Sequence, residues 1–379
     1  MFFLKKVFYL LLNERLKFKF ENFMSYSISG IQQLGIGLSS LKEGWHFYKE
    51  HFGMNIPLFN DEAEAKLMTP YTGGEVHKRQ AILALHTQGG GGFELWQFKS
   101  RKPQKSKDDL LLGDLGINAG KIKVLDIEKC HKSLLDNGLN VSDIHETPCG
   151  QHNFYLLDSF KNIFEFITFE DWFKKGNQNN GGVCGAVIGC SNIENSLKVY
   201  QDILGFTEVI FDTTSIFPEF EFLLNGGKKF RRVKLKHPQP KKGAFGNFLG
   251  DTELELIQAI DYEGKKIYQD RFWGDVGFIH LCFDVVNMDK LKEKAEKNGH
   301  PFTVDSAESF DMGDAQGHFS YIEDPDGTLI EFVETYKVPV LKKLGWFVNL
   351  SNRDRSKNLP NWLMSALALN KFANPNKTF

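Results

Sequence analysis

The segment DPDGTLIEFVET, residues 324–335, decides the fold class because it joins a tight turn to a strand with a glutamate among apolar residues. Asp-Pro-Asp-Gly is a turn sequence, and the apolar, β-branched and aromatic residues around Glu331 favour a strand. Burying a carboxylate without a partner costs several kcal/mol. Glu331 therefore marks a position where a polar partner or a bound ion is expected.

The same closing pattern occurs three more times along the chain, and each copy also has a glutamate between apolar residues. The closing segments are FELWQF (93–98), DSFKNIFEFITF (158–169) and LELIQAI (254–260). Each closing segment is preceded by an opening strand that runs into a short amphipathic helix. The opening segments are IQQLGIGLSSLKEGWHFYKEHFGM (31–54), GINAGKIKVLDIEKCHKSLLDNGL (116–139), CGAVIGCSNIENSLKVYQDILGF (184–206) and GFIHLCFDVVNMDKLKEKAEKNGH (277–300). The pattern predicts an α+β chain of four βαβββ modules, which we number one to four.

The modules alternate in kind, which indicates that a two-module unit was duplicated. The separation between the opening register and the closing glutamate is 61 residues (33 to 94), 46 (119 to 165), 70 (185 to 255) and 51 (280 to 331). We therefore predict two tandem domains, residues 25–172 and 182–336, joined by a polar linker at 173–181. Residues 1–24 are expected to form an N-terminal arm, and residues 337–379 a tail with a helix in LPNWLMSALALNKF (359–372).

The composition is that of an ordinary globular protein, with 41% hydrophobic residues, 25% charged residues and a formal net charge of −2. Such a charge gives no field that would attract nucleic acid or anionic lipid. The apolar run at residues 7–12 is too short for a secretory signal, and no stretch is long enough to span a bilayer. The five cysteines form no close pair, which indicates a reducing compartment. We expect a cytoplasmic protein that binds neither nucleic acid nor membrane.

A second set of candidate residues comes from the register of the opening strands. Counting back seven residues from the strand-end positions 40, 126, 192 and 287 gives Gln33, Ala119, Gly185 and His280. Alternate side chains of a strand face the same way, so these residues can converge with the four closing glutamates on one face of a sheet. Taken alone, a histidine in the FIHLCF strand, residues 278–283, is more often a core histidine than a metal ligand.

Two further stretches, one rich in glycine and one basic, are predicted to have structural roles. GGGGF, residues 89–93, lacks the lysine of a phosphate-binding loop and is read as a turn. KKFRRVKLKH, residues 228–237, alternates charged and apolar residues and is read as a strand with a solvated face.

Over residues 25–336 the repeat resembles the vicinal oxygen chelate superfamily, which includes glyoxalase I, bleomycin-resistance proteins and extradiol dioxygenases. The resemblance is carried by GIGL (35–38), FYKEHFGM (47–54) and DPDGTLIEF (324–332). It implies curved mixed sheets that enclose clefts, in a monomer or a homodimer. It also implies that metal ligands come from the first and last strands of the modules.

The resemblance implies two ways of combining the modules. Where two-module units are fused, a glyoxalase-type site can pair module one with module four, and module three with module two. The first pairing gives Gln33, Glu94, His280 and Glu331, which is a complete ligand set. The second gives Gly185, Glu255, Ala119 and Glu165, which lacks both neutral ligands. A dioxygenase site would need a second histidine, and Gly185 stands where it is expected.

The complete set suits one divalent metal ion, Zn²⁺, Ni²⁺, Co²⁺ or Mn²⁺, or Fe²⁺ in a dioxygenase. By resemblance, the expected function is a glyoxalase I-like lyase or isomerase acting on a small α-oxo or α-hydroxy compound, or its thiol adduct, through a metal-stabilised enediolate. Glu331 is the expected base, with Glu94 opposite it. The expected substrate pocket comprises Gly35, Gly37, Trp96, His318 and Tyr321. An Fe²⁺ dioxygenase and a non-enzymatic protein that binds a small ligand remain the alternatives.

Overall fold

The computed structural model describes residues 25–238, 242–307, 310–312, 315–341, 345–351 and 353–372. The expected N-terminal arm, residues 1–24, lies outside the described residues.

The first half of the chain contains two runs of one strand, one helix and further strands. The first run is β1 (Ser27–Gly37), α2 (Leu41–His51), β2 (Met54–Glu64), η1 (Lys66–Tyr71), β3 (Lys78–His86) and β4 (Gly92–Phe98). The second run is β5 (Gly116–Val124), α3 (Ile127–Asp136), β6 (Asn140–Val141), β7 (His145–Glu146), β8 (His152–Leu157) and β9 (Ile163–Thr168).

The second half has the same order of elements and adds a C-terminal segment. The third run is β10 (Asn180–Gly189), α4 (Ile193–Leu197), the π-turn η2 (Lys198–Ile203), β11 (Glu208–Ser215), η3 (Pro218–Phe220), β12 (Phe230–Lys236), α5 (Gly246–Leu249) and β13 (Glu253–Ala259). The fourth run is β14 (Gly277–Val286), α6 (Met288–Lys297), β15 (Val304–Asp305), β16 (Phe310–Met312), β17 (Ala315–Glu323) and β18 (Leu329–Leu341). The C-terminal segment has β19 (Trp346–Asn349), α7 (Asn361–Ala366) and η6 (Leu367–Phe372).

The helices begin where the sequence supplies a capping side chain. Ser40, Asp126 and Asn192 each accept a hydrogen bond from the backbone N–H three residues later, which fixes the first turns of α2, α3 and α4. Asn287 precedes α6 with a φ of 70°, a left-handed conformation that asparagine tolerates. The residues used to set the register of the opening strands are therefore the helix caps.

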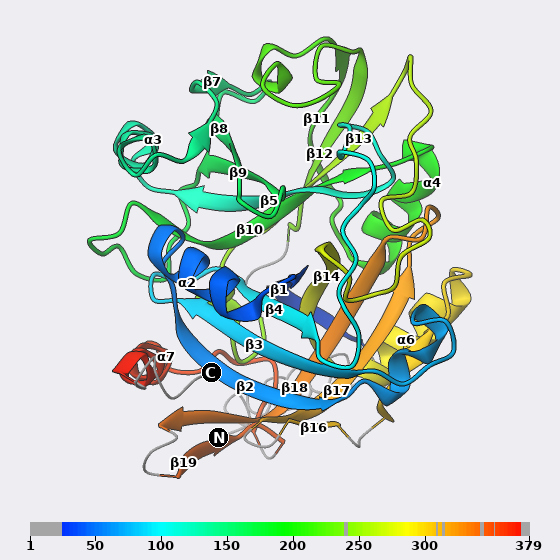
Figure 1. Ribbon diagram of the computed structural model, residues 1–379. Helices are drawn as coiled ribbons and strands as arrows, with labels where there is room; N and C mark the ends of the chain where they lie inside the picture. The colour runs from blue at the N-terminus through cyan, green and yellow to red at the C-terminus, as the bar shows by residue number, and fades with distance from the viewer. Residues whose placement is uncertain are drawn as a thin grey trace, which may run out of the picture.

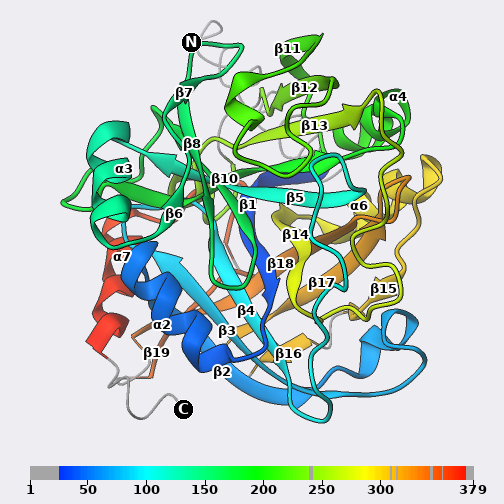
Figure 2. The ribbon, with the colours of Figure 1, turned by 45° about the horizontal axis from the view of Figure 1, so that its top comes forward.

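The strands form two mixed sheets, and each sheet combines the first run with the fourth or the second with the third. The first sheet has the order β15-β17-β18-β14-β1-β4-β3-β2, and the second has the order β11-β12-β13-β10-β5-β9-β8-β6. Figures 1 and 2 show the second sheet, in green and cyan, above the first sheet of blue and orange strands. Both sheets are curved, and the predicted α+β class with curved mixed sheets is confirmed.

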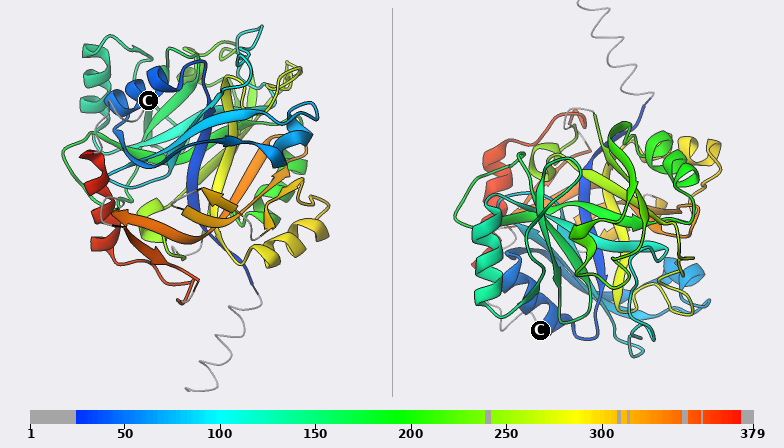
Figure 3. Two further views of the ribbon diagram at one scale, coloured as in Figure 1. Left: turned by 60° about the horizontal axis from the view of Figure 1, so that its bottom comes forward. Right: turned by 90° about the horizontal axis from the view of Figure 1, so that it is seen from above.

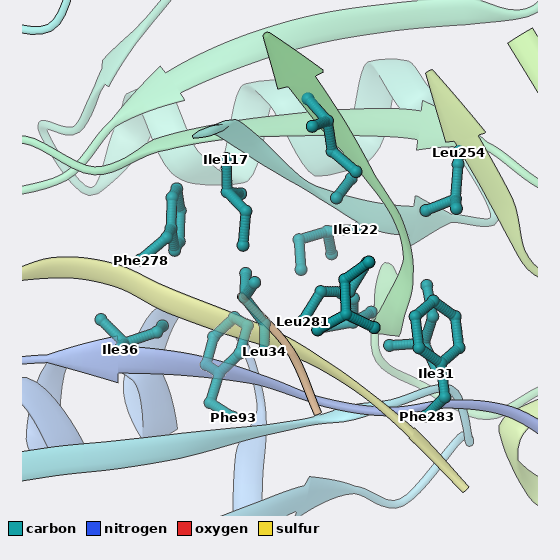
Figure 4. Packing of buried hydrophobic residues seen from close by; sticks show 14 of the residues in the cluster. Ile31, Leu34, Ile36, Phe93, Ile117, Ile122, Leu254, Phe278, Leu281 and Phe283 are labelled. Atoms are coloured by element: carbon teal, nitrogen blue, oxygen red, sulfur yellow. The ribbon is translucent and has the colours of Figure 1, made fainter. Parts of the chain in front are cut away.

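The two sheets pack back to back through their central strands. Figure 4 shows Ile117 and Ile122 of β5 facing Leu34 of β1 and Leu281 of β14, and all four side chains are buried. Gly120 of β5 is required here, because a Cβ atom would lie 2.5 Å from the Leu34 side chain. This apolar layer leaves the opposite, concave face of each sheet available for polar residues.

The glycine run between β3 and β4 lies at the junction of the two sheets. Gly91 donates a backbone hydrogen bond to Val183 O at 2.8 Å, and a Cβ on Gly90 would lie 2.9 Å from the Gly182 backbone. The glycines are therefore needed for close approach of two backbones, in keeping with their reading as a turn.

Two buried tyrosines also tie the sheets together. Tyr48 of α2 donates to Asp158 Oδ2 at 2.6 Å, and Tyr200 of η2 donates to Asp324 Oδ2 at 2.9 Å. The first bond joins a helix of the first run to the turn before the last strand of the second run. The second bond joins the third run to the fourth in the same way.

We expect the Tyr48→Phe variant to lose about 1.5–3 kcal/mol of unfolding free energy, because a hydrogen bond to a charged acceptor disappears without creating a cavity. Chemical denaturation would measure this loss. A loss below about 0.5 kcal/mol would mean that the bond does not hold the sheets together.

The C-terminal segment lies beside the first sheet. Residues of η6 contact β2 and β18, and α7 contacts α5 and β18. Figure 3 shows both elements, in red, at the edge of the molecule. No helix among the described residues is long and apolar enough to cross a membrane.

Candidate metal centre

The structure brings Gln33, Glu94, His280 and Glu331 together on the concave face of the first sheet. They come from β1, β4, β14 and β18, which are neighbouring strands in the sheet. Gly35 of β1 pairs with both His280 and Glu94, and Gln33 pairs with Cys282, which in turn pairs with Glu331. Residues separated by 61 to 298 positions thus meet through strand register alone.

The polar atoms of this cluster lie at short and similar separations. Nε2 of His280 is 3.0 Å from Glu331 Oε2 and 3.3 Å from Glu94 Oε2. Nε2 of Gln33 donates to the same two oxygens, at 3.3 Å each. All four side chains are buried, and His280 is fully inaccessible.

These separations fit a shared divalent ion. Two atoms that each lie about 2.1 Å from one ion are about 3.0 Å apart at a right angle and about 3.4 Å apart at a tetrahedral angle. The candidate ligand atoms of Glu94, His280 and Glu331 all lie within 4.8 Å of one another. Among the described residues, Nε2 of His280 finds no hydrogen-bond partner of normal geometry, despite its two carboxylate neighbours. A half-turn of the Gln33 amide would present its oxygen in place of its nitrogen.

Without an ion, the charge of the cluster is balanced by the imidazole. Burial lowers the pKa of His280, but the nearby carboxylates of Glu331 and Glu94 raise it to about 10. No lysine or arginine of the described chain forms an ion pair with Glu94 or Glu331. Two buried carboxylates with no permanent cation are an arrangement that favours a bound metal.

Aromatic residues surround the imidazole. The hydroxyl of Tyr321 on β17 is 3.4 Å from Nδ1 of His280, and the Trp273 ring stacks on the imidazole with centroids 6.4 Å apart. Trp96 packs against Trp273 at 4.5 Å. Tyr321 thus contacts the cluster directly, and Trp96 reaches it through Trp273; the assignment of both residues to a substrate pocket stays a prediction. Trp273 lies in the loop before β14, where the sequence has no repeating pattern, and was not predicted.

Two of the expected pocket residues do not leave room for a substrate. A Cβ on Gly35 would lie 2.4 Å from Cε1 of His280, and one on Gly37 would lie 1.8 Å from the Asp275 carbonyl oxygen. The space beside both glycines is therefore filled by the protein, which corrects the expectation of an open subsite there.

His318 faces away from the cluster. It lies three positions before Tyr321 on β17, and successive side chains of a strand alternate between faces. Its Nε2 is 2.6 Å from Asp305 Oδ1 instead. The expectation that His318 lines the substrate pocket is corrected, because its register directs it to the other side of the sheet.

The equivalent position in the second sheet holds an internal cation. Nζ of Lys121 on β5 lies 2.7 Å from Glu165 Oε2 and 2.8 Å from Glu255 Oε2, and all three side chains are buried. Lys121 pairs with Gly185, just as Cys282 pairs with Gln33, so Lys121 occupies the register of Cys282. The second sheet thus has an ammonium group between its two carboxylates, and Ala119 and Gly185 stand at the registers of His280 and Gln33.

The basic stretch of residues 228–237 also contributes to this second cluster. Arg232 Nε donates to Glu255 Oε1 at 2.6 Å, and Lys234 Nζ lies 2.7 Å from Glu253 Oε1. Both basic side chains are fully buried. The reading of β12 as a strand with a solvated face is wrong for these two residues, because their face of the strand closes over the glutamates.

A cavity adjoins the first cluster. It has a volume of about 80 Å³, and Gln33, Glu94 and Glu331 form part of its lining. A larger cleft of about 370 Å³ lies elsewhere and is lined by none of the four cluster residues, although it reaches Trp273. The smaller cavity is therefore the one that connects with the candidate metal centre.

The sequence of the second half has a recognisable family. Residues 185–332 match the model of the Glyoxalase/Bleomycin resistance protein/Dioxygenase superfamily. The resemblance predicted from the sequence is thus confirmed, and no curated protein matches the chain.

Solved structures of this superfamily extend the likeness to most of the chain. Glyoxalase I from Zea mays is 12% identical over 82% of this chain and 92% of its own, with a TM-score of 0.51. A mutant of that enzyme gives 14% identity, the same share of both chains and a TM-score of 0.52. A proposed dioxygenase from Bacillus subtilis subsp. subtilis str. 168 is 13% identical over 81% of this chain and 86% of its own, with a TM-score of 0.53. At these identities the likeness establishes the fold alone.

Proposed function

We propose that the protein is a metal-dependent lyase or isomerase of the glyoxalase I type, acting on a small α-oxo or α-hydroxy compound or its thiol adduct. The observation that carries the proposal is the convergence of Gln33, Glu94, His280 and Glu331 around one point. These residues would hold the metal. When bound, a divalent ion would act as a Lewis acid that binds two neighbouring substrate oxygens and stabilises negative charge on them.

The proposed roles of the side chains follow from their positions. Glu331 is the proposed base that removes a proton from the carbon next to the substrate carbonyl, and Glu94 faces it across the cluster. Tyr321 orients His280 through the contact of its hydroxyl with Nδ1. Trp273 covers the imidazole and excludes water from it.

The cluster supports this reaction class better than dioxygenation. Iron dioxygenases with two histidines and one carboxylate need a second imidazole. The partner strand of β14 supplies Gln33, and Gly185 lies in the other sheet beside Lys121. Oxygen uptake with a catechol or a 2-oxo acid as the substrate would contradict this choice.

We expect His280→Ala to weaken metal binding by more than the roughly 10–100-fold that follows loss of a residue supporting a metal ligand. Elemental analysis of protein purified without added metal, followed by Zn²⁺ and Co²⁺ titration, measures this. His318→Ala is the matched control, because His318 is also buried but faces the other side of the sheet. Equal and negligible metal in wild type and His280→Ala would sink the proposal.

A further inference from the structure

We infer that the substrate of this proposed site carries a short apolar group, which is bound in the cavity beside the cluster and limited in length by Met364 and Leu367 of the C-terminal segment. The inference rests on the proposed function and deepens it by naming the substrate class.

The walls of the cavity are almost entirely apolar. Beyond the cluster residues, Lys337 is the single charged side chain that lines it among the described residues, and its ammonium lies over the Phe347 ring at 4.4 Å. The apolar lining comes from four parts of the chain: β2 and β3, the short helix α5 with Phe245 before it, β18, and the C-terminal segment. It includes Phe59, Leu83, Leu85, Phe248, Met364 and Leu367.

Register explains why this cavity exists in the first sheet. Leu83 of β3 pairs with Glu94, and Lys234 of β12 pairs with Glu255. Two residues along, Ala81 pairs with Trp96, and Arg232 pairs with Ile257. The second sheet thus places long basic side chains where the first sheet has leucine and alanine. In the first sheet, apolar side chains therefore border the carboxylates of Glu94 and Glu331.

The C-terminal wall is held in place by hydrogen bonds at both ends. Leu359 N donates to Ala244 O at 2.8 Å, and Asn370 Nδ2 donates to Val340 O at 3.1 Å. Between these bonds, Leu363, Met364 and Leu367 are buried against the first sheet. Met364 and Leu367 face the cavity, whereas Leu363 does not line it.

The volume sets the size of the apolar group. A cavity needs about 10–15 Å³ to hold one water, so about 80 Å³ accommodates roughly five to eight water-sized atoms. Part of that space is needed for the two substrate oxygens and their two carbons, which leaves room for roughly one to four further carbons. A tripeptide thiol adduct has two further carboxylates. Lys337 is the single cation that lines the cavity in the described chain, so the cavity cannot pair both carboxylates and favours a substrate without them.

The test uses the full-length protein loaded with Zn²⁺ and a series of straight-chain 2-oxo acids from pyruvate to 2-oxodecanoate, with S-hexylglutathione for comparison. Calorimetry gives the dissociation constants. Each added methylene should tighten binding about threefold to fourfold until the cavity is full, after which the gain stops. S-hexylglutathione should bind more weakly than 2-oxohexanoate.

Two substitutions and one control variant test which residues set the maximum length of the apolar chain. Met364→Ala and Leu367→Ala each remove three side-chain heavy atoms from the wall of the cavity. In these variants the affinity should therefore keep rising for about two more carbons of the 2-oxo acid chain. Leu363→Ala is the matched control because it is buried in the same segment but should leave the limit unchanged. Thermal unfolding with and without Zn²⁺ checks that all three variants are folded.

The outcomes separate the two proposals. Metal-dependent binding that does not vary with chain length, or a limit that shifts equally in Leu363→Ala, would overturn the apolar-group inference and leave the proposed function intact. Tighter binding of S-hexylglutathione than of any oxo acid would also overturn it. Absence of Zn²⁺ binding in wild type would overturn the proposed function itself.

Discussion

Replacing Gln33, His280 and Cys282 with glycine, alanine and lysine should abolish metal binding and yet leave the protein folded. These are the residues that the second sheet has at the same registers, namely Gly185, Ala119 and Lys121. The new lysine should place its ammonium between Glu94 and Glu331, as Lys121 does between Glu165 and Glu255. It would then give the two carboxylates a permanent cation in place of the ion.

The control is the double variant Gln33→Gly/His280→Ala, which lacks the new lysine. It should lose about 3–5 kcal/mol of unfolding free energy, because two buried carboxylates are left without a positive partner. Adding Cys282→Lys should recover most of that loss without restoring metal binding. Calorimetric metal titration and denaturant unfolding measure the two properties separately. A triple variant no more stable than the double variant would contradict the equivalence of the two sites.

The second large effect is expected at Lys121. Lys121→Met should lower the unfolding free energy by about 3–5 kcal/mol, because it removes one partner of a buried charge network and leaves the buried Glu165 carboxylate without its cation. Glu255 keeps its ion pair with Arg232, whereas Glu165 keeps only a hydrogen bond from the uncharged Asn153 side chain, at 2.8 Å.

An exposed ion pair provides the control for Lys121→Met. Lys132 and Asp136 form an exposed ion pair at 2.9 Å on α3, so Lys132→Met should not change the stability measurably. Urea unfolding of both variants tests the contrast. If Lys121→Met were as stable as wild type, the internal cation would not support the second sheet. The metal content of this variant should remain that of wild type, since the first sheet is unchanged.

The sequence was informative where register and strand alternation act alone. Helix caps at Ser40 and Asn287 gave the register of β1 and β14, and counting from them selected Gln33 and His280, which the structure places next to each other. The adjacency of the first and last modules also follows from pairing two-module units, and β1 and β14 are neighbours. The superfamily resemblance was predicted from the same pattern.

Alternation was less informative about which face of a strand is buried. Arg232 and Lys234 alternate with apolar residues, a pattern typical of a half-exposed strand, but both faces of β12 are covered. His318 was placed near the cluster because of its residue type, whereas its register puts it beside Asp305. Trp273 and the C-terminal residues Met364 and Leu367 come from segments without repeat, and only tertiary packing brings them to the site.

We propose above all that the protein binds one divalent ion on the first sheet and none on the second. Anomalous diffraction from crystals grown with Co²⁺ would test this most directly. We predict one strong peak about 2.0–2.2 Å from ligand atoms of Gln33, Glu94, His280 and Glu331. No peak at these residues, or a peak between Glu165 and Glu255, would contradict the proposal.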